Sequence, residues 1–148
     1  MSSVFICFYQ KNSNFFPDFF ELFHVYAGLQ KGHYIANHPK LALSAGSELA
    51  QTIKHEMSLA AEQNRPLKYL LFVAHDTTLA AQLKMLGQTI EGIPPYASEL
   101  NYSLFDTGSS NYEVRVTSNQ KPLFIEQCGS ENCTLNDFIN LMDVHYQN

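Results

Sequence analysis

Arginine is scarce in this sequence. Only two arginines, Arg65 and Arg115, occur among its 148 residues, the net charge is −5, and charged residues make up 16% of the chain. That charged content is below the usual level of about a quarter. A nucleic-acid-binding protein needs a basic face, so the composition argues against a nucleic-acid partner. Arginine side chains are also the usual ligands of phosphate oxygens, so a phosphate site in this chain would be short of its commonest ligand.

Long apolar runs are also missing. No stretch reaches the roughly 18 apolar residues of a membrane-spanning helix, so we expect no membrane span. Val4–Tyr9 is apolar, but it is six residues long and no positively charged residue precedes it. Such a segment is a poor core for a signal peptide, and no signal peptide is visible in this chain.

Cysteine is limited to three residues. Cys128 and Cys133 lie close together in the sequence CGSENC, whereas Cys7 stands alone near the N-terminus. The close pair could form a small disulfide loop or remain two thiols. Zinc binding is disfavoured, because a tetrahedral site needs four ligands and no second close Cys/His pair follows. The cysteines therefore indicate no metal site.

The chain has room for one domain or for part of a larger one. Its hydrophobic content of 45% is enough to form a core. Residues 1–38 are irregular and unusually aromatic, and Pro17-Asp18 can open a helix that Gly28 closes. Two interpretations of this segment stay open. It packs on the core of the same chain, or it packs against chain that is absent here.

One strand–turn–helix stretch organises the rest of the sequence. Leu67–Val73 is mostly apolar and is predicted to form a buried β-strand. The chain then turns at residues 74–78 and enters an amphipathic helix that ends at Gly87. Such a turn places His75 and Asp76 beyond the carboxyl end of a strand and beside the first free N–H groups of a helix. In open α/β sheets ligands bind at this position, and a helix N-terminus favours anions.

Helices are predicted on both sides of this strand, over residues 44–62 and 78–86. The expected apolar stripes are Leu49, Ile53, Met57 and Ala60 in the first helix, and Leu79, Leu83 and Leu86 in the second. His55 lies on the polar side of the first helix and is expected to be solvated. The order helix, strand, helix is the core of an α/β unit, so α/β is the predicted fold class.

A β-hairpin is predicted in the last third of the chain. The prolines of Ile93–Ser98 make a rigid extended connector before it. Apolar and polar residues then alternate over 99–105 and 111–117, which predicts two antiparallel strands joined by a turn. Arg115 falls in the second of them and is expected at the surface. Lys121–Glu126 leaves room for a short third strand.

A final helix is predicted after Thr134. Thr134 and Asp137 have the spacing of a capping box, which satisfies the first free N–H groups of a helix. Its expected apolar positions are Leu135, Phe138, Ile139 and Met142.

Taken alone, the His-Asp pair is a weak signal of function. Asp76 could serve as a helix N-cap, a role that Thr77 or Thr78 could share. His75 could be a partly buried histidine with satisfied hydrogen bonds. On the spacing alone, this structural interpretation is the stronger one.

The order of several motifs along the chain is a stronger signal than the His-Asp pair alone. AHDTT follows the apolar strand, PPYAS follows the helix, and a strand hairpin and a Cys pair running into CTLNDF come next. This order and spacing, from roughly Phe20 to Val144, resemble the C-terminal part of the histidine acid phosphatases, the prostatic and lysosomal type and their bacterial relatives. The most specific pieces are Ala74–Thr78 and Pro94–Ser98.

The resemblance implies a partial phosphoglycerate-mutase-like, three-layer α/β fold and hydrolysis of phosphate monoesters at acid pH. By the same match, His75 would contact the phosphate and Asp76 would protonate the departing alcohol. A carboxyl group near an anion and partly out of water has a raised pKa, which suits a proton donor at acid pH. The resemblance also favours a Cys128–Cys133 disulfide, which would require an oxidising compartment. It implies a periplasmic, secreted or lysosomal location and no cofactor.

One family motif is absent. In the family an N-terminal R-H-G-x-R-x-P segment carries the nucleophilic histidine and two phosphate-binding arginines, and no R-H-G occurs in this sequence. By this comparison, residues 1–148 are a single incomplete domain that holds only the acid half of the site and is inactive alone. The family strand that bears R-H-G lies beside the one matching Leu67–Val73. Its absence would leave an open sheet edge, a site for self-association.

Three functional hypotheses follow. The leading one is the C-terminal half of a histidine acid phosphatase, from a truncated or split gene or an incomplete gene model, that acts on phosphate monoesters when an N-terminal half completes it. The second is a non-catalytic remnant that binds a partner or a phosphorylated ligand at His75. The third, an unrelated Ser or Cys hydrolase, is disfavoured because the sequence has no G-x-S-x-G.

Two Asn-x-Ser/Thr sequences, Asn101-Tyr102-Ser103 and Asn132-Cys133-Thr134, are potential glycosylation acceptors in a eukaryotic secretory pathway. Two such matches also arise easily by chance in a chain rich in Asn and Ser.

Overall fold

The computed structural model describes residues 38–63, 68–92 and 94–144. In chain order these residues form α3 (Pro39–Gln63), α4 (Asp76–Met85), β1 (Leu100–Gly108), β2 (Asn111–Ser118), β3 (Lys121–Pro122), the short 3-10 helix η1 (Glu126–Cys128), β4 (Asn132–Thr134) and α5 (Leu135–Val144). They combine helices with a small antiparallel sheet, so the fold is mixed α/β. None of these helices is both long enough and apolar enough to cross a membrane. The expected helix after Pro17 lies outside the described residues.

The long helix α3 confirms the helical pattern expected over residues 44–62 and begins five residues earlier, at Pro39. Proline is favoured at the first position of a helix, where its missing N–H would have no partner in any case. The buried side chains of the expected stripe are Ile53 and Met57, joined by Ala50, while Leu49 and Ala60 are half-buried. His55 is exposed, as expected.

The β-hairpin is confirmed. β1 and β2 pair antiparallel, with Tyr102 opposite Val116 and Leu104 opposite Val114. Ser109 and Ser110 have positive φ angles of 55° and 61°, the backbone that matches a two-residue turn to the twist of the strands. The expected third strand is reduced to the two residues of β3, and the unpredicted strand β4 pairs with β2 beyond it.

The helix α5 begins where the capping box predicted. The N–H of Asp137 donates to Thr134 Oγ1 at 3.1 Å, and the Thr134 hydroxyl donates to Asp137 Oδ2 at 2.7 Å. Its buried residues are Phe138, Leu141 and Met142, while Leu135 and Ile139 are half-buried. The disulfide favoured by the resemblance is present between Cys128 and Cys133.

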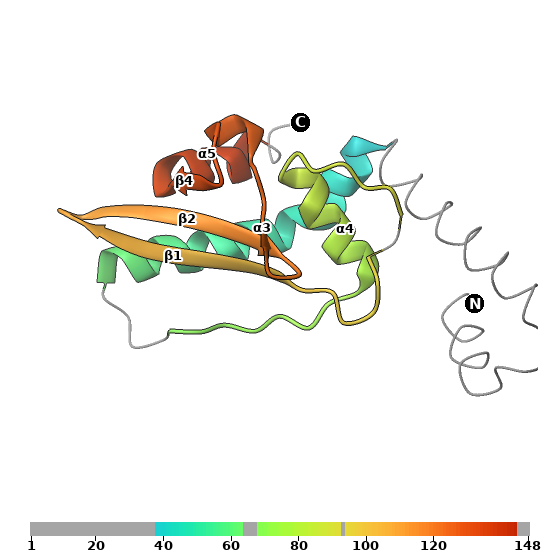
Figure 1. The fold of residues 1–148 in the computed structure, drawn as a ribbon, viewed down its shortest axis with the longest axis horizontal. Coiled ribbons are helices and arrows are strands. Elements are labelled where there is room, and N and C mark those ends of the chain that lie inside the picture. The colour runs from blue at the N-terminus through green and yellow to red at the C-terminus, as the bar shows by residue number, and fades with distance from the viewer. Residues whose placement is uncertain (1–37, 64–67, 93, 145–148) are drawn as a thin grey trace, which may run out of the picture.

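The core lies between the helices and one face of the sheet. Figure 1 shows the hairpin of β1 and β2 crossing α3, with α5 beyond β2 and α4 at one end of α3. The side chains at its centre are fully buried: Met85, Leu86, Val114, Val116, Ile125, Cys133 and Phe138. The helices and the sheet therefore share one hydrophobic core. β2 contributes every second side chain to it, Val114 and Val116.

The helix α4 ends at Met85, and Gly87, the residue predicted to stop it, follows just after its last turn. This glycine has a φ of 77°, which costs glycine little because it has no Cβ. The N–H of Gly87 donates to the carbonyl of Lys84 and the N–H of Gln88 to the carbonyl of Leu83, both at 3.0 Å. This pair of bonds is a common helix ending and satisfies two otherwise free carbonyl groups.

The buried face of α4 differs from the expected one. Of the three leucines predicted to be buried, Leu79 and Leu83 are only half-buried. Ala80 and Ala81 are buried instead, because α4 packs against α3 at Gly46. Small side chains on both helices permit this close approach, and it turns the two leucines partly outward.

The prediction of a buried strand at Leu67–Val73 is wrong for the described part of that segment. Residues 68–75 run extended but belong to no strand, and Figure 1 shows them passing below β1 as a separate segment. Tyr69 is 74% exposed and Val73 is 93% exposed. An apolar sequence can favour the extended conformation, but a strand also needs neighbours to accept its hydrogen bonds. The described residues form no parallel sheet, so the phosphoglycerate-mutase-like arrangement stays a prediction.

Candidate acid–base site

The His75-Asp76 pair lies at the start of α4, as predicted. His75 is the residue before the helix and keeps an extended backbone, with φ −87° and ψ 161°. Its carbonyl accepts the N–H of Leu79 at 3.1 Å, the first bond of the helix. Asp76 is the first helical residue, so its side chain stands among the free N–H groups of the first turn.

The Asp76 carboxylate interacts with the helix terminus. The backbone N–H of Thr77 donates to Asp76 Oδ1 at 2.7 Å. Acidic groups are favoured at this end of a helix by its free N–H groups and by the helix dipole. The side chain of Asp76 is half-buried.

His75 is exposed and does not cap the helix with its side chain. The alternative of a partly buried structural histidine is therefore wrong. An imidazole and a carboxylate on consecutive residues thus stand at a helix N-terminus. The imidazole can donate a hydrogen bond to an anion, and the carboxyl group beside it can act as a general acid or base.

Arg115 contacts Asn132 and Phe105 of the sheet, and neither of these contacts involves His75 or Asp76. Its Nε donates to Asn132 Oδ1 at 2.8 Å, and its guanidinium carbon lies 5.1 Å from the centre of the Phe105 ring. The side chain is exposed, as predicted. Arg65 lies outside the described residues. The described part of the chain therefore supplies no arginine whose contacts place it beside the acid.

The connector after α4 is less extended than predicted. Residues 96–97 form a turn, in which the N–H of Ser98 donates to the carbonyl of Pro95 at 3.2 Å. Ala97 has a φ of 58°, a backbone that residues with a Cβ seldom adopt. Tyr96, at the tip of the turn, is 67% exposed.

A polar cluster that the sequence did not reveal holds α4 in place. Gln82 is only 2% exposed, and its Nε2 donates to the carbonyl of Gly46 in α3 at 2.7 Å. The hydroxyl of Tyr102 in β1 donates to Gln82 Oε1 at 3.0 Å. Burial raises the pKa of Tyr102 well above its ordinary value, so the hydroxyl keeps its proton. The only signal in the sequence is a lone glutamine beside two alanines of the same helix.

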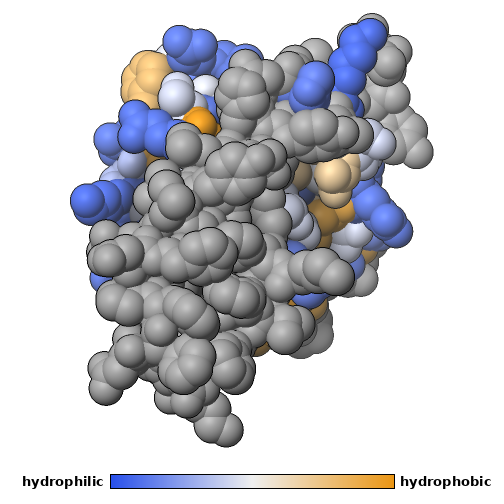
Figure 2. Space-filling model, turned by 90° about the vertical axis from the view of Figure 1, so that its right-hand side faces the viewer, coloured by the Kyte–Doolittle hydropathy of each residue, from blue (hydrophilic) through white to orange (hydrophobic). Residues whose placement is uncertain are grey.

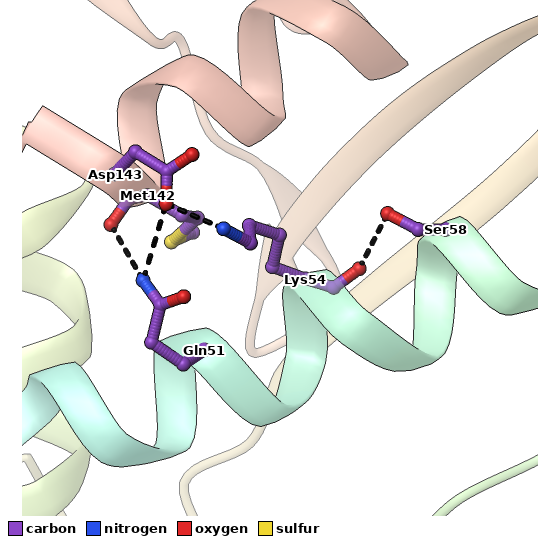
Figure 3. A network of polar contacts seen from close by, with 5 residues as sticks. All are labelled: Gln51, Lys54, Ser58, Met142 and Asp143. Carbon is purple, nitrogen blue, oxygen red and sulfur yellow. Dashed lines mark hydrogen bonds and ion pairs between the residues drawn. The ribbon is translucent and has the colours of Figure 1, made fainter.

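A second polar cluster joins α3 to α5. Figure 3 shows Gln51 and Lys54 pointing from α3 toward Asp143 near the end of α5. Lys54 forms an ion pair with Asp143, and Gln51 Nε2 donates to the carbonyl of Met142 at 3.2 Å. The hydrogen bond from Lys54 lowers the pKa of Asp143. This cluster fixes the packing of the helices and takes no part in the His75-Asp76 pair.

Comparison with known proteins gives this geometry a context. No family model matches the chain. The lysosomal acid phosphatase of Bos taurus is 34% identical over 110 residues, which cover 70% of this chain and 26% of the relative. The lysosomal acid phosphatases of Homo sapiens and Rattus norvegicus are 33% and 32% identical, with the same coverage.

The chain thus spans about a quarter of the length of the curated relatives it matches. The resemblance to acid phosphatases that the order of the motifs predicted is therefore confirmed over 70% of this chain. The protein carries a partial acid-phosphatase-like region, similar over 70% of its own length to the lysosomal acid phosphatases.

Proposed function

We propose that this chain carries the acid half of a histidine acid phosphatase site, with Asp76 as the proton donor and His75 as a phosphate contact. The observation that carries the proposal is the placement of both residues at the start of α4. There the Asp76 carboxylate is half-buried beside the first N–H groups, and His75 is exposed next to it.

The proposed chemistry is hydrolysis of a phosphate monoester. When the P–O bond to the alcohol breaks, negative charge develops on the departing oxygen. Protonated Asp76 would give that oxygen its proton, which lowers the barrier most for poor leaving groups. An N–H of His75 and the free N–H groups of α4 would face the phosphate oxygens and offset their charge.

The attacking half of such a site has to come from elsewhere. The sequence contains no R-H-G, and the family mechanism needs that histidine as nucleophile and its neighbouring arginines as phosphate ligands. We therefore expect residues 1–148 to act as one incomplete domain, inactive alone, whose phosphate monoester substrate binds only after an N-terminal half completes it. The completed domain would have the phosphoglycerate-mutase-like fold.

The exposed segment Tyr69–Val73 supports this view. Its five residues are all large and hydrophobic, and each is at least 42% exposed. Because successive side chains of an extended segment point to opposite sides, both of its faces are apolar. Such a sequence is typical of a parallel strand covered on both faces by helices. A completing half would supply the neighbouring strands.

The same segment favours a second candidate, a non-catalytic module that binds a partner or associates with itself. Unpaired, apolar extended backbone can pair with another chain. On the face drawn in Figure 2, hydrophobic residues of the described part are visible between hydrophilic ones. Size-exclusion chromatography with light scattering tests self-association. A monomer at all concentrations would count against it.

The disulfide supports a location in an oxidising compartment. Disulfides persist in oxidising compartments, and Cys128–Cys133 closes a loop in this chain. The relatives are named lysosomal enzymes. We propose a lysosomal or secreted location for this protein.

The function can be tested in a completed enzyme. The chain would replace the matching quarter of the bovine lysosomal acid phosphatase, and hydrolysis would be measured at acid pH with two substrates. p-Nitrophenyl phosphate has a good leaving group, and an alkyl phosphate has a poor one. If Asp76 is the proton donor, Asp76→Asn lowers kcat for the alkyl phosphate far more than for p-nitrophenyl phosphate.

The matched control is Asp106→Asn, at an exposed carboxylate of the hairpin. It should leave both rates unchanged. Equal losses for both substrates on Asp76→Asn would contradict the donor role. The chain alone should give background rates, and turnover above background that Asp76→Asn removes would contradict its incompleteness.

A further inference from the structure

Two potential glycosylation sequences lie in the described sheet, and their surroundings differ. We propose that Asn101, and not Asn132, carries an N-linked glycan when the protein passes through a eukaryotic secretory pathway. The inference concerns modification of the outer sheet surface and does not depend on the phosphatase proposal.

Asn101 lies on the outer face of β1. Its neighbours Leu100 and Tyr102 pack against the core, whereas Asn101 itself is exposed and stands opposite Thr117 of β2. β1 is an outer strand of the described sheet, so one of its sides is not covered by another described strand. A large hydrophilic group on Asn101 therefore meets solvent and displaces no core side chain.

The third residue of this sequence, Ser103, is half-buried. Ser103 lies two positions along the same strand, hence on the same face as Asn101. Its hydroxyl is 3.4 Å from Asn101 Oδ1, a long hydrogen bond within the acceptor sequence itself.

The second sequence is built into the fold at all three positions. Asn132 is half-buried, and its Oδ1 accepts the hydrogen bond from Arg115. Cys133 is fully buried and forms the disulfide with Cys128. The hydroxyl of Thr134 caps α5 through Asp137. A glycan at Asn132 would have to fit beside the Arg115 side chain and the closed disulfide loop.

The modification is a group transfer from a lipid-linked oligosaccharide diphosphate. The Nδ2 atom of Asn101 attacks C1 of the first sugar, and a C–N bond forms. The bond from C1 to the diphosphate oxygen breaks, and the lipid diphosphate leaves with the electron pair. One amide proton passes to a base of the transferase. The same oxidising compartment that permits the Cys128–Cys133 disulfide contains this donor in eukaryotic cells.

The test uses the full chain behind a cleavable secretory leader in cultured animal cells, so that entry into the pathway is assured. Cells and medium are analysed together for a mobility shift removed by peptide-N-glycosidase. Mass spectrometry then identifies the asparagine converted to aspartate. We expect one shift, lost in Asn101→Gln and in Ser103→Ala.

Two variants separate acceptor chemistry from folding. Ser103→Thr keeps a hydroxyl at the required position and should retain the shift, and Asn132→Gln should leave it unchanged. The proposal is wrong if the wild-type chain shows no shift, or if a shift survives Asn101→Gln and disappears in Asn132→Gln.

Discussion

The hydroxyl of Tyr102 donates a hydrogen bond to Oε1 of Gln82 across 3.0 Å, and this bond joins the first strand of the hairpin to α4. On its other side, the amide of Gln82 donates to the carbonyl of Gly46 at 2.7 Å. One buried side chain thus connects α3, α4 and β1 less than two turns from Asp76. This contact helps to hold α4, the helix that begins at Asp76, against the core.

Replacing Gln82 with Met should destabilise the fold. The substitution leaves the buried Tyr102 hydroxyl without its acceptor, and an unsatisfied buried polar group costs about 1–3 kcal/mol. The measurement is urea unfolding of the full chain followed by circular dichroism. Tyr102→Phe in the Gln82→Met background should then cost much less than in the wild type. Equal costs in both backgrounds would show that the two residues are not coupled.

Replacing Gly46 with Ala should also destabilise the fold, although alanine is favoured over glycine inside a helix by about 1 kcal/mol. An added Cβ would lie 2.6 Å from Met85 Sδ and 3.2 Å from Gln82 Nε2. Met85 is 1% exposed, so its side chain has little room to move. Overpacking of this kind costs about 1–3 kcal/mol.

Thermal unfolding of Gly46→Ala checks this prediction, and a shortened neighbour provides the control. In the Met85→Ala background the same change should be neutral or stabilising, because the clash with the sulfur is gone. A loss of the same size in both backgrounds would locate the strain elsewhere.

The ion pair between Lys54 and Asp143 should contribute a small, pH-dependent stability. The pKa of Asp143 is lowered in the folded chain, first of all by the hydrogen bond from Lys54. Its contribution is therefore complete above the ordinary carboxyl pKa of about 4 and is lost as the pH falls through the lowered value. The Asp143 side chain is 42% exposed, so solvent screening limits the contribution to about 1 kcal/mol or less.

Urea unfolding of wild type and Lys54→Met at pH 6 and at pH 2 measures this effect. The two proteins should differ at pH 6, and the difference should shrink toward pH 2 as Asp143 takes up a proton at its lowered pKa. High salt should shrink the difference at pH 6. A difference that is independent of pH would assign the effect to the packing of the Lys54 side chain.

Removal of the disulfide should destabilise the chain by about 2 kcal/mol, the chain-entropy value for a loop of this length. The bridge joins η1 to β4, and Cys133 is fully buried within the core. Mass spectrometry after alkylation, with and without reduction, counts the bridged thiols. Unfolding of the protein in reducing and oxidising buffer measures the stability. Alkylation of both cysteines without reduction would contradict the bridge.

A charge placed in the exposed segment should leave the isolated chain unharmed. Val73 is 93% exposed, so Val73→Lys should change the unfolding free energy by about 0.5 kcal/mol or less. In the chimaeric phosphatase the same change should abolish activity if the segment becomes a buried strand there. Val116→Lys, at a fully buried position of β2, should unfold both proteins. Full activity of the Val73→Lys chimaera would argue against burial of the segment in the completed enzyme.

Local rules were sufficient for much of this protein. Residues 44–62 are helical because of their apolar spacing, and α5 begins directly after Thr134 because of its capping box. The hairpin follows from alternating side chains, and α4 ends just before Gly87 because glycine accepts a positive φ. The position of His75 and Asp76 at a helix start was likewise predictable, since it depends only on where that helix begins.

Tertiary contacts decided what those rules could not. Leu79 and Leu83 are half-buried because α3 approaches α4 on its alanine side, a fact that no helical pattern contains. Gln82 is buried because Gly46 and Tyr102 supply both of its partners. Tyr69–Val73 has the composition of a central strand, yet a strand exists only through hydrogen bonds to neighbouring strands. The sequence alone could determine its apolar character, but its exposure depends on what packs beside it.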